Sequence, residues 1–354
     1  MNHTSTHRPL KVFVAGLGQM GRSHALAYHT NPAFEVVGLH NRTEVDLPPE
    51  LARYPRIDTF EAGLALRPDV VSINTYTDSH AAMAIAALES GAHVFVEKPL
   101  ALTLESAQAV VDAARRTGRK LVIGYILRHH PSWEQFIKTA RDLGAPYVMR
   151  LNLNQPSIGT AWDIHKRLLQ TTPPFVDCGV HYVDVMCQIS DARPIQVRGM
   201  GARLATDIPE DQVNYSHLQV LFDDGSVGWY EAGWGPMMSR TACFVKNVIG
   251  SRGAVSLVMG DEADPSDINS HTQAGQLCVR VLPDTPGAED VTEAWIPIPA
   301  SVDHQSLCDR EQAFLAEAVF NDMDLDDHYD AAIQSLRIVL AAEQSMRERR
   351  AIDL

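Results

Sequence analysis

Short apolar runs alternate with helix-like stretches along the first third of the chain. The apolar runs fall at residues 10–15, 34–39, 69–74, 91–98 and 120–125. Gly91 and Gly118 each follow a helix-like stretch, where a left-handed residue ends a helix at little steric cost. Short buried strands that alternate with helices predict βαβ units and a parallel sheet covered on both faces.

Three glycines follow the first apolar run in the sequence AGLGQMG. Gly16, Gly18 and Gly21 have G-x-G-x-x-G spacing between a predicted strand and a predicted helix. The first allows a tight turn, the second allows close backbone approach to a pyrophosphate, and the third allows helix and strand to pack closely. The loop therefore predicts a dinucleotide site with phosphates at the helix N-terminus. The alternative is a glycine-rich turn without a ligand.

The second apolar run ends in LHNRT, where NAD-binding domains often carry an acid for the ribose hydroxyls. Asn41 stands in the place of the acid, and Arg42 follows it. A neutral side chain removes repulsion against a 2′-phosphate, and a guanidinium is a bidentate donor to it. The pair favours NADP over NAD, unless Arg42 stacks on the adenine or points into solvent.

The stretch VFVEKPLA at 94–101 ends an apolar strand with a charged pair and a proline. We expect it to be the fifth strand of the nucleotide domain, with its carboxyl end at the crevice where ligands bind. Lys98 there could donate hydrogen bonds or positive charge to a substrate hydroxyl, with Glu97 holding its ammonium in place. The alternative is an exposed ion pair of little energetic weight.

A second polar group lies in the sequence FVDCGVHYVDVMCQI. Asp177, His181 and Asp184 are separated by four and three residues, so in one helix they would share a face. A histidine flanked by carboxylates suits a general base near neutral pH. Three alternatives stay open: a structural histidine, a zinc site with poor spacing that uses Cys178, and a Cys178 nucleophile with no evident base.

The composition is that of a soluble globular protein, with 45% hydrophobic and 21% charged residues among 354. A net charge of −14 without a basic run disfavours nucleic-acid binding. Five widely spaced cysteines without a C-x-x-C pair fit a reducing compartment better than a disulfide framework. The start MNHTSTHRPL is no secretory signal and no apolar stretch would span a bilayer, so we expect a cytoplasmic protein.

Several segments together resemble one family. VFVAGLGQMGRSHA, TDSHAAMAIAALESGAHVFVEKPLA, GYILRHHPSWEQF and VDCGVHYVDVM are similar in order and spacing to the glucose–fructose oxidoreductase, inositol dehydrogenase and MocA (Gfo/Idh/MocA) family. The final HYDAAIQSLRIVLAAEQSMRERR is similar to the closing helix of that family. The resemblance implies an α/β protein with a Rossmann domain, and a second α/β domain with a large, mostly antiparallel open sheet.

We expect the Rossmann domain at residues 8–126 and the second domain at 127–354, with the closing helix at about 328–349. VNYSHLQVLFDDGSVGWYEAGW agrees with the implied sheet, because two alternating runs flank Asp224-Gly225, a strong hairpin signal. Family members commonly associate through the outer face of this sheet, which implies a homodimer or homotetramer.

The resemblance also implies roles by position. Lys98 matches a lysine between nicotinamide and substrate, His181 a histidine that accepts the hydroxyl proton, and Asp177 an acid that helps to bind substrate. The implied cofactor contacts are Gly16, Gly18, Gln19, Met20, Gly21, Asn41, Arg42, Thr75, His80, Glu97 and Lys98. The implied substrate contacts are Lys98, Arg128, Trp162, Asp177 and His181. Further polar groups at the mouth of the predicted substrate site are His129, Asp163, His165 and Lys166. No metal is expected.

The implied activity is hydride transfer between a secondary hydroxyl of a sugar or cyclic polyol and the nicotinamide of NAD(P). Besides the missing ribose acid, the chain departs from the family at Tyr76-Thr77, where members often have two prolines, and at 172–174, where T-P-P replaces paired glycines. These departures bear on the cofactor's surroundings and the substrate pocket. Two other classes stay open: a glycosidase-type enzyme that uses a retained NAD, and a non-catalytic regulator that senses sugar or dinucleotide.

Overall fold

The computed structural model describes residues 7–259, 274–283, 291–298 and 302–354, and it divides into two compact units. The first unit contains the chain up to residue 126 together with 304–333, and the second contains 127–303 together with 334–354. The first six residues, part of the start expected to carry no leader, lie outside the described residues. Within the described ranges, no helix is both long enough and apolar enough to cross a membrane.

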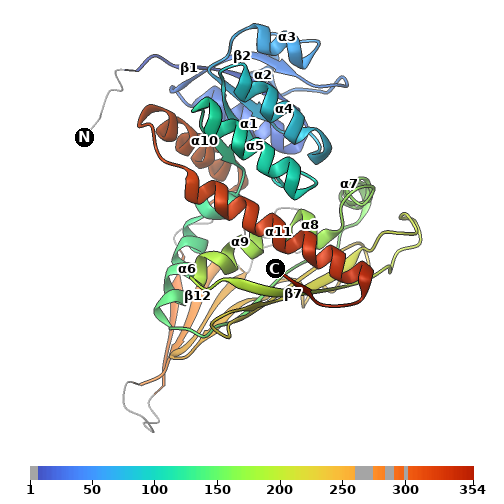
Figure 1. Ribbon diagram of the computed structural model, residues 1–354, viewed down its shortest axis with the longest axis vertical. Coiled ribbons are helices and arrows are strands. Elements are labelled where there is room, and N and C mark those ends of the chain that lie inside the picture. Colours follow the sequence, from blue (N-terminus) through green and yellow to red (C-terminus); the bar gives the residue numbers. More distant parts are fainter. Residues whose placement is uncertain (1–6, 260–273, 284–290, 299–301) are drawn as a thin grey trace. The chain divides into compact units, whose positions relative to one another are not determined.

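A five-stranded parallel sheet in the order β2-β1-β3-β4-β5 forms the centre of the first unit (Figure 1). Its strands are β1 (Leu10–Ala15), β2 (Phe34–His40), β3 (Val70–Ile73), β4 (His93–Val96) and β5 (Leu121–Ile123). Its helices are α1 (Gln19–Thr30), α2 (Pro49–Ala52), α3 (Phe60–Ala65), α4 (Thr77–Glu89), α5 (Leu104–Thr117), α10 (His304–Phe320) and the start of α11 (Asp326–Glu348). The predicted parallel sheet of βαβ units is confirmed.

The VFVEK stretch leads out of the fourth strand of this sheet, so the prediction of a fifth strand was wrong. Between β2 and β3 the chain forms only the two short helices α2 and α3 and one isolated bridge from Leu39 to Arg56. Pro49 is the first residue of α2, where proline is favoured. The Thr59 side chain caps α3 by accepting a hydrogen bond from the N–H of Ala62. His80 consequently follows the third strand.

Helix α10 belongs to the first unit, although the sequence led us to place every residue after 126 in the second domain. It packs against α1, and Gln312 Nε2 lies 2.9 Å from His24 Nδ1. The start of α11 is fixed to the same unit, because His328 Nε2 accepts a hydrogen bond of 2.9 Å from the N–H of Ile123. The chain thus leaves the first unit after Ile126 and returns to it from His304 to Ile333.

The second unit contains a nine-stranded sheet in the order β13-β12-β11-β10-β6-β9-β8-β7-β14. Its strands are β6 (Val148–Gln155), β7 (Pro194–Ala202), β8 (Tyr215–Phe222), β9 (Val227–Trp234), β10 (Lys246–Gly250), β11 (Gly253–Met259), β12 (Ala274–Val281), β13 (Thr292–Pro297) and β14 (Ile352–Asp353). Every pair is antiparallel except β6 with β9. The predicted mostly antiparallel sheet is confirmed.

The helical segments of this part of the chain are η1 (Ile126–His129), α6 (Pro131–Asp142), α7 (Gly159–Leu168), α8 (Pro174–Asp177), α9 (Gly179–Ile189) and the rest of α11. Helices α6, α8 and α9 pack against the sheet (Figure 1). Tyr182 of α9 stacks on Tyr230 of β9 with ring centroids 4.6 Å apart, and this aromatic contact anchors α9. The predicted hairpin is β8–β9, in which Gly225 takes φ +85°.

Candidate active site

The glycine loop between β1 and α1 depends on two close backbone approaches. Gly16 has φ +89°, and a Cβ there would lie 2.4 Å from the carbonyl oxygen of Asn74. A Cβ on Gly21 would lie 1.9 Å from the carbonyl oxygen of Gly16. Neither position admits a side chain without backbone movement. A Cβ on Gly18 would meet nothing within 4 Å, so there is space beside the middle of the loop.

The N-terminus of α1 is suited to an anion. Gly18 is its N-cap and supplies no side-chain hydrogen bond, and the first turn contains no acidic residue. Gly18 and Gln19 are exposed and Met20 is half-buried, so the first turn is accessible. Uncapped N–H groups at the positive end of a helix dipole favour a phosphate. The loop and this turn therefore fit a dinucleotide's pyrophosphate.

Asn41 supports the glycine loop from the end of β2. Its Oδ1 accepts a hydrogen bond of 2.8 Å from the N–H of Leu17, and its Nδ2 donates to the carbonyl oxygen of Thr43 at 2.9 Å. The sequence had placed Asn41 only at the ribose and had not indicated this role in the loop. Arg42, the next residue, is exposed.

The carboxyl ends of β1, β3 and β4 lie side by side, because these strands are parallel neighbours with Ala15 paired to Ile73 and Ile73 paired to Val96. Gly16 follows the first strand, Asn74-Thr75 the second and Glu97-Lys98 the third. One sheet edge thus brings together most of the cofactor residues that the sequence predicted. This is the edge at which open α/β sheets bind ligands.

His80 joins two of the loops at this edge and is 1% exposed. Its Nδ1 lies 2.8 Å from the carbonyl oxygen of Pro99, and its Nε2 lies 3.0 Å from that of Thr75. Burial lowers the pKa of His80, although both carbonyl oxygens favour the charged ring. His80 therefore holds the loop after β3 against the loop after β4, and its contact with a cofactor stays a prediction.

Glu97 points into the first unit and is only 6% exposed, which excludes the surface ion pair considered from the sequence. Its Oε1 lies 2.8 Å from Nε2 of His24, and its Oε2 accepts a hydrogen bond of 3.1 Å from the backbone N–H of Lys98. Burial alone would raise the pKa of Glu97, but His24 and the positive charge of Lys98 keep it below its usual value. The carboxylate thereby fixes the backbone at Lys98.

In the second unit, Asp177 and His181 lie on two consecutive helices, whereas the sequence had indicated one. Helix α8 ends at Asp177 and α9 begins at Gly179, with Cys178 between them at φ −89° and ψ −29°. A Cβ on Gly179 would lie 3.3 Å from the ring of Tyr230, so α9 starts where the core leaves little room. Asp177 is half-buried and His181 is 6% exposed.

Asp184 forms a buried ion pair with Arg128. The guanidinium donates from Nε to Oδ2 at 2.9 Å and from Nη2 to Oδ1 at 2.5 Å, and Gln188 Nε2 also donates to Oδ2, at 2.8 Å. Asp184 is 2% exposed, so the pair ties α9 to the segment before α6. Arg128 was expected to bind substrate, and that role stays a prediction beside the structural one.

Trp162 and His165 lie in and beside an apolar cluster that includes Trp234. The Trp162 Nε1 donates to Asp207 at 3.2 Å. The His165 ring stacks on Trp234 with centroids 4.5 Å apart, and its Nδ1 lies 2.9 Å from Ser157 Oγ. Burial lowers the pKa of His165 to about 4, against the opposing charge of Asp177, so the ring is neutral at pH 7.

Sequence reasoning missed residues whose partners are distant in the chain. His24 is fully buried and bonds Glu97, but nothing local to α1 indicates it. Asn74, against which Gly16 packs, could have been found from its place directly after an apolar strand. Ser157 and Trp234 acquire their roles from contacts with His165 that no local pattern predicts.

Two family descriptions match the chain. "Oxidoreductase family, NAD-binding Rossmann fold" matches residues 10–125, and "GFO/IDH/MocA C-terminal domain" matches residues 137–256. A UDP-N-acetylglucosamine 3-dehydrogenase of Acidithiobacillus ferrooxidans is 30% identical over 201 residues, which cover 56% of this chain and 60% of that protein. A D-glucoside 3-dehydrogenase of Escherichia coli is 29% identical over 52% of this chain and 55% of that protein.

A scyllo-inositol 2-dehydrogenase (NAD(+)) of Bacillus subtilis is 29% identical over 261 residues, 68% of this chain and 72% of that protein. The matched segments thus span only a little over half of the first two relatives. Solved structures agree over almost the whole chain. GenD2 from gentamicin A biosynthesis, in complex with NAD, has a TM-score of 0.77 at 20% identity, with 100% of this chain and 99% of that chain covered.

The structure of UDP-N-acetylglucosamine 3-dehydrogenase GnnA from Acidithiobacillus ferrooxidans has a TM-score of 0.76 at 22% identity, with 96% of this chain and 98% of that chain covered. At such identities the likeness concerns the fold. The family descriptions match both parts of the chain, and the fold agrees with them. The chain therefore belongs to the Gfo/Idh/MocA family.

Proposed function

We propose that this protein is an NAD(P)-dependent oxidoreductase that transfers a hydride between a secondary hydroxyl of a sugar or cyclic polyol and the nicotinamide. The edge of the first sheet carries the proposal, because an uncapped helix N-terminus follows β1 there and a fixed Lys98 follows β4, with only β3 between these two strands. The names of the relatives, dehydrogenases of a nucleotide sugar, a glucoside and an inositol, support a carbohydrate or cyclitol substrate.

His181 accepts the proton of the reacting hydroxyl in this proposal. An imidazole suits a general base near neutral pH, and burial of His181 to 6% exposure limits competition from water. Asp177, on the preceding helix, accepts a hydrogen bond from a substrate hydroxyl and orients the ring.

Lys98 stabilises the negative charge that develops on the oxygen as its proton leaves, an electrostatic role of the oxyanion type. The bond from its backbone N–H to buried Glu97 fixes the position from which the ammonium extends. A bound dinucleotide would supply the hydride acceptor, and the glycine loop and the first turn of α1 would present N–H groups to its pyrophosphate.

Further parts of the proposal concern the cofactor and the assembly. Arg42 is exposed beside the glycine loop, and position 41 is an asparagine where NAD-binding domains often carry an acid, which supports NADP.

The protein is a homodimer or homotetramer that associates through the outer face of the nine-stranded sheet. The number and wide spacing of the five cysteines support a reducing compartment such as the cytoplasm.

A screen of sugars and inositols with NAD and NADP side by side tests the proposed activity. With the substrate so found, His181→Ala should lower kcat by about 100-fold or more, the usual scale for loss of a general base. Cofactor affinity should barely change. His217→Ala, a matched loss of a histidine on β8, should leave kcat unchanged. A His181→Ala enzyme that turns over like the wild type would make His181 structural.

A further inference from the structure

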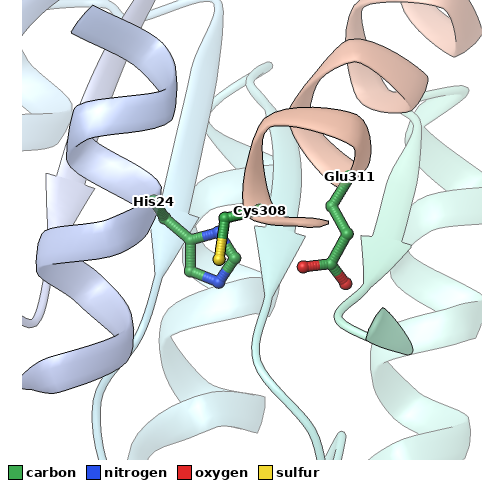
Figure 2. A group of neighbouring side chains, drawn as sticks. All are labelled: His24, Cys308 and Glu311. Atoms are coloured by element: carbon green, nitrogen blue, oxygen red, sulfur yellow. The ribbon is translucent and has the colours of Figure 1, made fainter. Parts of the chain in front are cut away.

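Three side chains that can ligate a metal ion meet inside the first unit, on the side of α1 that α10 covers. His24 comes from α1, and Cys308 and Glu311 come from α10 (Figure 2). A ring nitrogen, the sulfur and a carboxylate oxygen all lie within 4.8 Å of one another. All three residues are at most 1% exposed.

Glu311 is buried, but no hydrogen bond from the described residues offsets the loss of water around its carboxylate. Neither of its carboxylate oxygens has a hydrogen-bond partner among the described residues, and the Oε1 of the adjacent Gln312 also lacks one. A buried carboxylate is expensive unless a proton or a cation neutralises it. Acceptor oxygens without donors fit a position beside a bound cation.

His24 is oriented as a metal ligand would be. Its Nε2 lies 2.8 Å from the buried Glu97 carboxylate, which places the ring proton on Nε2 and leaves the lone pair on Nδ1. Metal-bound histidines usually donate their second nitrogen to a carboxylate in this way. The Gln312 amide now contacts Nδ1 at 2.9 Å and would turn away when an ion binds.

We propose that His24, Cys308 and Glu311 form a buried site for a divalent ion of the zinc class, which fastens α10 to α1. Nitrogen, thiolate and carboxylate donors are those that zinc takes, and tetrahedral bonds of about 2.0–2.3 Å put ligand atoms roughly 3.3–3.7 Å apart. Small side-chain rotations from separations of at most 4.8 Å close that geometry.

Charge balances at this site. The Cys308 thiol releases its proton to solvent and Glu311 binds as the carboxylate, so two negative ligands neutralise the ion. Two of its ligands, Cys308 and Glu311, come from the part of the first unit that was predicted to belong to the second domain. Its role is structural, and it adjoins the proposed hydride-transfer residues through the bond from His24 to Glu97.

Cobalt titration of the full-length protein, after dialysis against a chelator, tests the site. Wild type should take up one Co²⁺ per chain with a sulfur-to-cobalt charge-transfer band, Zn²⁺ should displace it, and either ion should raise Tm. Cys308→Ser should lose the band and Glu311→Gln should bind far more weakly. Glu97→Gln, which weakens the partner of His24 and leaves the three ligands in place, should weaken binding about 10–100-fold. Cys187→Ser, a matched change on α9, should bind like the wild type.

Uptake below one tenth of an equivalent by wild type, with Tm indifferent to metal and chelator, would overturn the proposal. So would a cobalt band that survives Cys308→Ser. If Glu311→Gln raises Tm while wild type binds no ion, Glu311 is a protonated acid and the metal site is rejected. These measurements need no substrate turnover, and wild type alone decides the matter where a variant fails to fold.

Discussion

Lys246 on β10 is a fully buried lysine in the second unit. Its Nζ lies 4.7 Å from the ring centroid of Tyr182 and 4.5 Å from that of Phe244, and it donates to the carbonyl oxygen of Asn152. The two rings favour the ammonium form. Burial has the larger effect and lowers the pKa of Lys246 to about 7. The side chain packs under Tyr182, the neighbour of His181 on α9.

The shifted pKa predicts a pH dependence of stability. Between pH 7 and about 10.4, the usual lysine pKa, the unfolded chain binds the proton that the folded chain lacks. The free energy of unfolding should therefore rise with pH in this window, by up to about 1.4 kcal/mol per pH unit from this group, and its penalty is constant below pH 7. Lys246→Met should remove this contribution and stabilise most at or below pH 7.

Urea unfolding at pH 6, 7 and 9 measures the effect. The exposed Lys138 provides the control, because Lys138→Met should leave the pH dependence as it is in the wild type. An unchanged gradient in Lys246→Met would show that Lys246 keeps its charge in the folded protein.

Substitutions at Asn41 and Arg42 can test the cofactor preference while the glycine loop keeps its structure. Asn41→Asp retains an oxygen that can accept the Leu17 N–H, but it adds a charge that repels a 2′-phosphate, so preference should move towards NAD. Arg42→Ala should weaken NADP about tenfold or more and NAD far less, because only NADP carries the phosphate. Dissociation constants for both cofactors give the answer. A wild type that prefers NAD, with Arg42→Ala neutral towards both, would contradict the assignment.

At the scale of elements, the pair between Arg128 and Asp184 holds α9 against the segment before α6. The Asp184 side chain is 2% exposed and that of Arg128 is 22% exposed. Removal of one partner leaves a buried charge uncompensated, so Arg128→Ala should cost about 3 kcal/mol of stability, reduced by whatever Gln188 still supplies. Thermal and urea unfolding measure this loss. Arg141→Ala breaks the exposed pair with Asp191 and should cost at most about 1 kcal/mol.

The same variant separates the two roles of Arg128. If its main role is to bind substrate, Arg128→Ala should raise KM with little loss of Tm. A large fall in Tm with KM nearly unchanged assigns it to the support of α9.

Elements with strong local patterns could be predicted from the sequence. The apolar strands of the first sheet, the glycine turn and the β8–β9 hairpin have their signals within a few residues. The division between α8 and α9 could not be predicted, because the spacing of Asp177, His181 and Asp184 is compatible with one continuous helix. The division arises where Gly179 packs against Tyr230, which is distant in the chain. The strand count was wrong because the segment between β2 and β3 forms two short helices and no strand.

At the scale of the whole molecule, what escaped prediction depends on contacts between distant parts of the chain. His24 and Gln312 are 288 residues apart, and no local periodicity brings α10 back to the first unit. Lys98, Asp177 and His181 were predicted from motifs. The structure shows that buried Glu97 holds the backbone of Lys98, and that α9, which carries His181, packs on the core through Tyr182 and Tyr230. Motifs name candidate site residues, while the packing that holds them is distributed over the sequence.

We propose that Lys98 and His181 assist hydride transfer from a hydroxylated ring, and Lys98→Ala distinguishes this role from a purely structural one. Dinucleotide binding is measured by calorimetry, and formation of reduced nicotinamide is measured with the substrate found in the screen. We predict a folded variant with nearly unchanged dinucleotide affinity and hydride transfer reduced by at least about 100-fold, while Lys11→Ala, an exposed lysine on β1, behaves as the wild type. Turnover at the wild-type rate in Lys98→Ala would contradict the claim.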